Sequence, residues 1–184
     1  MFQQDYIPTM EDIRRVPMRT LSDLGSSFEF GNVVYHLIDP GSAQMEQKNW
    51  NYAFLGVDTV IFVFDVSAYC ISVGDGEMNK MDEQLMLWGK LALAPRSPNE
   101  RIIVIFTKED RLTPDRLERW IFSEYFPGFQ GDPLDVEDIL QNIAGLLTSM
   151  MKRVTVIERL PIFWRTSFEN EPIEIAMVDL KCSN

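Results

Sequence analysis

The stretch TVIFVFDVS, Thr59 to Ser67, is almost continuously apolar, and RIIVIFTK, Arg101 to Lys108, repeats the pattern. Runs of this kind are typical of strands buried on both faces, and sheets of such strands are usually parallel with helices on either side. A third run, LPIFWRTS from Leu160 to Ser167, predicts a further strand. The fold class that we expect is therefore α/β, with a mostly parallel sheet and flanking helices.

Helical patterns lie between and after these strands. Residues 77–94 carry apolar side chains near helical spacing. Thr113 looks like an N-cap before a proline, and it opens a predicted helix over 114–126. Residues 136–153 make the clearest helix, with acids early and two basic residues at its end, as the helix dipole favours.

A hairpin is predicted before the first of the buried strands. Two β-rich runs in SSFEFGNVVYHLID meet at Gly31 and Asn32, which both tolerate positive φ. His36 in the second run has no Cys or His nearby, so we do not expect it to bind a metal.

Length, charge and cysteine content bound the function. The chain has 184 residues, a formal net charge of −11 and 46% hydrophobic residues, which suits one domain with a sizeable core. An acidic surface repels nucleic acids, so we expect no nucleic-acid partner. Cys70 and Cys182 form neither a disulfide framework nor a zinc motif. With no apolar run of about 20 residues and no Met-Gly start for myristoylation, we expect a cytoplasmic protein without a transmembrane segment.

Five motifs follow one another in an order that resembles a known family. They are YIPTMEDI (6–13), FLGVDTVIFVFDVSAY (54–69), GEMNKMDEQLMLW (76–88), IFTKED (105–110) and the Pro-Gly loop after SEYF (123–126). From about residue 5 to about residue 178, the chain resembles the C-terminal two-thirds of the Ras-like domain of a heterotrimeric G-protein alpha subunit. The resemblance implies GTP or GDP binding with Mg²⁺, GTP hydrolysis and receptor-coupled signal transduction.

The same resemblance implies a Ras-like P-loop NTPase fold that misses its first strand, P-loop and first helix. Residues 1–184 would be a single truncated domain, and residues 1–13 would be a remnant of the linker from the absent helical domain. The missing strand would lie between 33–38 and 59–64, so we expect these two strands to pair directly. The sequence ends where the family's last helix begins, so receptor coupling by the usual route is not expected.

The family reads the guanine base with two loops. Asn-Lys-x-Asp corresponds to Thr107, Lys108 and Asp110, so the lysine and the aspartate are kept. The second loop, Thr-Cys-Ala-Thr, corresponds to Phe163 through Thr166. Arg165 falls where a small residue lets a backbone N–H approach the guanine oxygen. The resemblance therefore predicts an altered base site.

The two switch regions hold the expected catalytic and metal positions. In the first, Thr20 falls on the Mg²⁺ ligand and Pro17 on the arginine finger, which is worth about 10³- to 10⁵-fold in rate. In the second, Ala43 replaces the glutamine that positions water, and Asp39 keeps a role in holding Mg²⁺. No catalytic group is intact, and the remaining predicted nucleotide contacts are Arg14, Arg15, Arg19, Gly41 and Ser42.

A predicted partner surface follows the second switch. In the family, this helix meets the beta-gamma dimer and a tryptophan anchors the contact. The corresponding residues are Glu46, Lys48, Trp50 and Phe54. Three hypotheses remain open: a G-alpha-type GTPase that hydrolyses GTP weakly or not at all, a non-catalytic module that binds beta-gamma or another partner, and an inactive fragment. Any membrane contact would be peripheral, at the inner plasma membrane and through partners.

Overall fold

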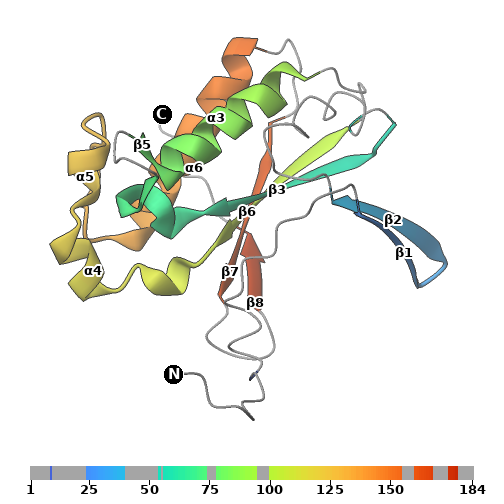
Figure 1. Ribbon diagram of the computed structural model, residues 1–184, viewed down its shortest axis with the longest axis horizontal. Helices are drawn as coiled ribbons and strands as arrows, with labels where there is room; N and C mark the ends of the chain where they lie inside the picture. The colour runs from blue at the N-terminus through green and yellow to red at the C-terminus, as the bar shows by residue number, and fades with distance from the viewer. Residues whose placement is uncertain are drawn as a thin grey trace, which may run out of the picture. The chain divides into compact units, whose positions relative to one another are not determined.

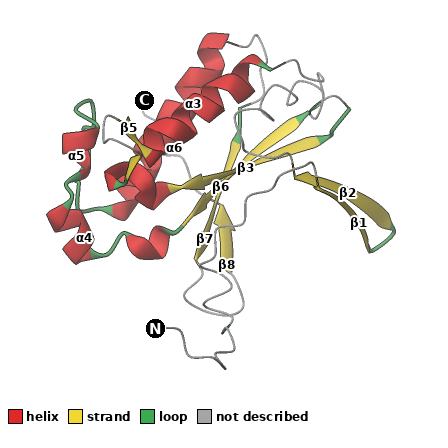
Figure 2. Ribbon diagram, in the orientation of Figure 1, coloured by secondary structure: helices red, strands yellow, loops and turns green. Residues whose placement is uncertain are grey.

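The computed structural model describes residues 9, 24–39, 54, 56–73, 78–94, 100–154, 160–167 and 174–177. The chain comprises two compact units, Met1–Ala53 and Phe54–Asn184. Figure 1 follows the chain from the N-terminus to the C-terminus, and Figure 2 distinguishes its helices, strands and loops.

The first unit contains the predicted hairpin. Strands β1 (Leu24–Phe30) and β2 (Val33–Asp39) pair antiparallel, and Gly31 in the turn has a φ of 63°. Phe28 lies opposite Tyr35, and their rings stack with centroids 5.1 Å apart. The Ser27 hydroxyl lies 2.8 Å from His36 Nδ1 on the facing strand. The polar partner of this histidine is thus a serine, in keeping with a structural role.

The second unit is built on a four-stranded sheet. Its strands, in spatial order, are β3 (Thr59–Asp65), β6 (Arg101–Thr107), β7 (Ile162–Ser167) and β8 (Glu174–Met177). The first three run parallel, and β8 runs antiparallel to β7. The prediction of an α/β fold with a mostly parallel sheet is confirmed for this unit.

Two long helices pack on this sheet. Helix α3 (Lys80–Leu93) begins with a capping box, in which the Asn79 side chain accepts from the Asp82 N–H and the Asp82 carboxylate accepts from the Asn79 N–H. Helix α6 (Val136–Val154) lies beside it (Figure 1), and Trp88 Nε1 donates to the Leu147 carbonyl at 2.9 Å. The short elements are η2 (Val66–Cys70), β4 (Ser72–Val73), β5 (Met78–Asn79), η3 (Glu109–Arg111), α4 (Pro114–Arg119) and α5 (Phe122–Tyr125).

The core lies between the sheet and the two long helices. Phe64 and Phe106 are fully buried on neighbouring strands, with ring centroids 6.0 Å apart. Phe163 continues the row on β7, 5.5 Å from Phe106. Packed aromatic rings of this kind bury large apolar areas and add specific edge contacts. The core therefore fixes the three parallel strands side by side.

Burial on both faces was predicted for the first apolar run, and this prediction is wrong for β3. Ile61 and Val63 are 50% and 60% exposed, whereas Val60 and Phe64 on the other face are buried. The reason is that the described helices α3 and α6 cover only the face that carries Phe64. The strand is also shorter than 59–67, because η2 begins directly after Asp65.

The single helix predicted over 114–126 is divided into α4 and α5. The Tyr69 hydroxyl donates to the Trp120 carbonyl at 2.8 Å, which fixes this carbonyl at the break. Phe122 is fully buried at the start of α5, with its ring 5.2 Å from that of Tyr69. Burial of this aromatic pair outweighs the continuation of the helix.

Residues 174–177 form β8, a strand that the sequence analysis did not predict. β2 pairs with β1, and β3 pairs with β6. The segments 33–38 and 59–64 lie in different units, and their direct pairing stays a prediction. The single-domain assignment and the linker remnant at residues 1–13 also stay predictions. Within the described ranges, the helices are too short or too polar for any of them to cross a bilayer.

Candidate functional site

The predicted base-reading residues lie at the carboxyl ends of the parallel strands. Asp65 is level with Thr107 in the β3–β6 register, and Phe106 is level with Arg165 in the β6–β7 register. Ligands of open α/β sheets bind outside these strand ends. The prediction of a loop at 163–166 is wrong, because these residues lie within β7, whereas 107–110 leads from the end of β6 into η3. The strand register still brings Arg165 close to the end of β6.

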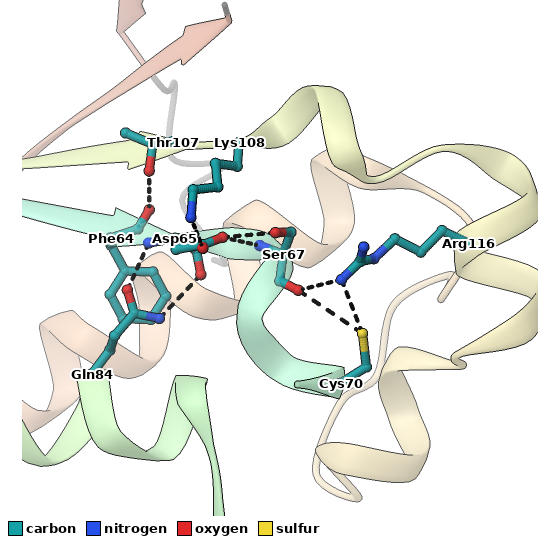
Figure 3. Close-up of polar contacts among 8 residues, drawn as sticks. All are labelled: Phe64, Asp65, Ser67, Cys70, Gln84, Thr107, Lys108 and Arg116. Atoms are coloured by element: carbon teal, nitrogen blue, oxygen red, sulfur yellow. Dashed lines mark hydrogen bonds and ion pairs between the residues drawn. The ribbon is translucent and has the colours of Figure 1, made fainter. Parts of the chain in front are cut away.

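Lys108 is the first residue after β6, and an acid holds its side chain. Its backbone is left-handed, with a φ of 62°, which directs the chain from the strand into η3. Lys108 Nζ lies 2.5 Å from Asp65 Oδ2 at the end of β3 (Figure 3). The lysine side chain is 42% exposed, and the aspartate side chain is 18% exposed. The ammonium group is thus already paired.

Asp65 is itself fixed on all sides. Its Oδ1 accepts from the Ser67 N–H at 3.0 Å and from the Ser67 hydroxyl at 2.8 Å. The Gln84 side chain on α3 bonds both main-chain groups of Asp65: Oε1 accepts from the N–H at 2.7 Å, and Nε2 donates to the carbonyl at 3.1 Å. Figure 3 shows this network. The carboxylate is therefore held in place, and the lysine reaches toward it.

Arg165, which lies in β7, is also paired with acidic side chains. Its Nη1 donates to Glu137 Oε2 of α6 at 3.0 Å and lies 3.5 Å from Glu109 Oε1. Burial raises the pKa of the Glu109 carboxyl above its ordinary value of 4.5, and the Arg165 charge offsets part of that rise. The arginine thus joins β7, η3 and α6.

The two threonines of the predicted site face neighbouring strands. Thr107 Oγ1 donates to the Phe64 carbonyl and Thr166 Oγ1 to the Phe106 carbonyl, each at 3.4 Å, and both residues are buried. Asp110 Oδ1 is buried and has no hydrogen-bond partner in the described part of the chain. One of the two oxygens of the Asp110 carboxylate is therefore screened from solvent.

An open hollow of about 570 Å³ lies beside these residues, along α4. Arg116 at its wall donates to the Ser67 carbonyl at 2.9 Å and contacts Cys70 Sγ at 3.1 Å (Figure 3). The lining residues are Asp110, Arg111, Thr113, Asp115, Arg116, Arg119 and Trp120.

Most of the predicted switch residues lie outside the described ranges. Asp39 ends β2 in the first unit and is exposed, while Phe54 in the second unit is only 9% exposed. No group of three or more metal-ligating side chains occurs in the described ranges. The predicted residues outside them are Arg14, Arg15, Pro17, Arg19, Thr20, Gly41, Ser42, Ala43, Glu46, Lys48 and Trp50.

Sequence reasoning missed the acids and the amide that complete the site. Asp65 carried a usable signal, because a carboxylate that closes the apolar run VIFVF stands where a buried strand ends. Gln84 and Glu137 lie 19 and 28 residues from their partners and carried no such signal.

A parallel sheet with charged residues gathered at its carboxyl edge is typical of α/β proteins that bind a ligand at that edge. The chain belongs to the G-protein alpha subunit family, whose family model matches residues 1–177.

Two relatives illustrate the similarity. The guanine nucleotide-binding protein subunit alpha-15 of Oryctolagus cuniculus is 30% identical over 148 residues, 79% of this chain and 39% of the relative. The guanine nucleotide-binding protein alpha-9 subunit of Dictyostelium discoideum is 28% identical over 129 residues, 70% of this chain and 37% of the relative. The matched region is thus well under half the length of either relative.

Proposed function

We propose that this chain is a G-alpha-type signalling protein that holds guanine nucleotide weakly and hydrolyses GTP poorly or not at all. Membership of the family and the names of both relatives, which are guanine nucleotide-binding proteins, support the ligand class. A cytoplasmic location, with peripheral attachment through partners, is part of the same proposal.

The observation that carries the proposal is the internal pairing of both cations at the base site. In the family, the lysine stem packs along guanine, and the second loop offers a backbone N–H. Here Lys108 is paired with Asp65, and Arg165 is held by Glu137 and Glu109. A base that enters must displace or deform these contacts, and their loss offsets part of the binding free energy.

Weak hydrolysis follows from two positions in the sequence. Pro17 occupies the finger position and has no charge to place on the transferred phosphoryl group. Ala43 occupies the position of the water-orienting glutamine and has no polar group. Each function is supplied by a side chain in phosphoryl transfer of this kind, so the loss of both removes most of the expected acceleration. Thr20 and Asp39 would hold Mg²⁺ if a nucleotide is bound.

The test is binding of a fluorescent GTP analogue with and without Mg²⁺, followed by single-turnover hydrolysis of GTP. We expect binding weaker than about 1 μM and no turnover above the uncatalysed rate. Competition with unlabelled ATP controls for specificity. Mg²⁺-dependent binding at micromolar or tighter affinity, together with measurable turnover, would overturn the proposal.

A second candidate is a non-catalytic module that binds beta-gamma or another partner. The internally paired base site favours it, because such a role needs no nucleotide. Trp50 would be the anchor, beside Glu46 and Lys48. A pull-down with purified beta-gamma should lose capture on Trp50→Ala and keep it on the exposed-helix control Met86→Ala. Equal capture by all forms would reject the candidate.

A further inference from the structure

We propose that Asp65 acts as an internal competitor for the guanine base and sets the nucleotide affinity of this chain. The inference rests on the proposed function, because its ligand is a guanine nucleotide. It assigns to Asp65 a role in the specificity and affinity of the site, which the sequence did not predict.

The geometry indicates that an incoming base would move the Lys108 side chain and leave Asp65 in place. Asp65 is anchored through Ser67 on its side chain and through Gln84 on its main chain, so its carboxylate cannot follow an incoming ligand. Among the residues that the structure describes, the Lys108 side chain makes its polar contact with this carboxylate alone. For the lysine stem to lie along a base, the ammonium must leave Asp65 or the base must fit around the existing pair.

The charge of the site decides between two roles for Asp65. The Asp65 carboxylate could keep the Lys108 side chain in position for the base, or it could withhold that side chain from the base. Two cations, Lys108 and Arg165, stand at the strand ends among four carboxylates, and Arg111 and Arg116 line the hollow beside them. Lys108 has no charge left to offer while its ammonium is paired with Asp65. A nucleotide brings further negative charge, which Asp65 repels while it neutralises the lysine that would attract it. Withholding is therefore the stronger effect. The carboxylates are those of Asp65, Glu109, Asp110 and Glu137.

Asp65→Asn is the sharpest variant. An asparagine keeps an oxygen that can accept from Ser67, so the cap of η2 survives, while an amide NH₂ replaces the oxygen that faces Lys108 Nζ. Binding of a fluorescent GDP analogue to the full chain should become about three- to tenfold tighter, in line with the release of one partly exposed ion pair. Glu118→Gln, an exposed residue of α4, removes the same charge away from the site and should leave affinity unchanged.

The ratio of the two affinities tests this inference, and the absolute affinity of the wild type tests the proposed function separately. Equal or weaker binding by Asp65→Asn overturns the role of Asp65, whatever the wild-type value. Absence of detectable binding by both proteins also overturns it, because the released lysine would then gain no ligand. A similar gain in Glu118→Gln would assign the effect to net charge and overturn it as well.

A second measurement needs no ligand. Amine acetylation followed by mass spectrometry compares Lys108 with Lys152, which is exposed on α6. Lys108 should react several-fold more slowly in the wild type, and the two rates should converge in Asp65→Asn. If that variant does not fold, Asp65→Ser takes its place, because its hydroxyl can also accept from Ser67. Equal rates in the wild type would overturn the inference without any variant.

Discussion

Arg165 Nη1 at the end of β7 donates to Glu137 Oε2 in the first turn of α6, across 3.0 Å. The contact joins β7 to the helix that packs on the sheet. A side chain at the position where the resemblance predicts a small residue is therefore built into the chain's own structure. Arg165 closes the site from the β7 side, as Lys108 does from the β6 side.

Replacing Arg165 with alanine tests this closure. Arg165→Ala removes both ion pairs and the bulk, so we expect about a three- to tenfold gain in affinity for a fluorescent GDP analogue. Because the arginine side chain is 37% exposed, the free energy of unfolding should fall by less than about 1 kcal/mol. Arg101→Ala, at the opposite end of β6, is the charge-matched control. Weaker binding by Arg165→Ala would show that the arginine serves the ligand instead.

Trp88 joins α3, α6 and the sheet, so its replacement should weaken the second unit. Trp88→Phe loses the hydrogen bond to the Leu147 carbonyl and leaves space in a fully buried position against Phe62. We expect a loss of about 1–3 kcal/mol in the free energy of unfolding, measured by urea denaturation. Met86→Leu, 55% exposed on the same helix, should change it by less than about 0.5 kcal/mol. Equal effects would contradict this packing.

Tyr69 predicts a loss of stability in alkali. Burial, aided by the nearby Cys70, raises the pKa of Tyr69 from 10.0 to about 12. The folded state therefore favours the neutral phenol, and the stabilisation is complete below pH 10 and is lost as pH rises through about 12. Tyr69→Phe, which removes the hydrogen bond to Trp120, should cost about 1 kcal/mol at neutral pH and lack this alkaline loss. Denaturation curves at neutral pH and at a pH of about 12 measure the free energy of unfolding of both proteins. An unchanged alkaline loss in the variant would contradict the assignment.

The raised pKa of Glu109 predicts a second pH dependence of stability, which begins at acidic pH. Its raised pKa means that the folded protein binds this proton more tightly than the unfolded chain does. The contribution of Glu109 to stability is therefore full below pH 4.5 and is lost as pH rises through the folded pKa. Glu109→Gln removes this titration, so the difference in stability between wild type and variant should shift in favour of the variant as pH rises. A difference that stays constant with pH would contradict the prediction.

The sequence predicted three of the four strands of the sheet, because their signals are local. The runs at 59–67, 101–108 and 160–167 gave β3, β6 and β7, and the Gly31-Asn32 pair gave the hairpin turn. The clearest helix, 136–153, matches α6 to within one residue. Continuous apolar runs and turn residues are read without knowledge of any distant contact.

Long-range contacts set the limit of that prediction. The break between α4 and α5 depends on Tyr69, 51 residues before Trp120 in the chain. The exposed face of β3 depends on which helices cover the sheet. At the site, the motif residues Lys108 and Arg165 could be found from the sequence, but their partners Asp65 and Glu137 come from other elements. Pairing of such residues is a property of the folded chain.

The affinity of the wild-type chain for GDP tests the central claim most directly. Isothermal titration calorimetry in the presence of Mg²⁺ measures it without a label. We predict a dissociation constant weaker than about 1 μM, because Lys108 and Arg165 are already paired with carboxylates. A Mg²⁺-dependent dissociation constant in the nanomolar range would contradict the account.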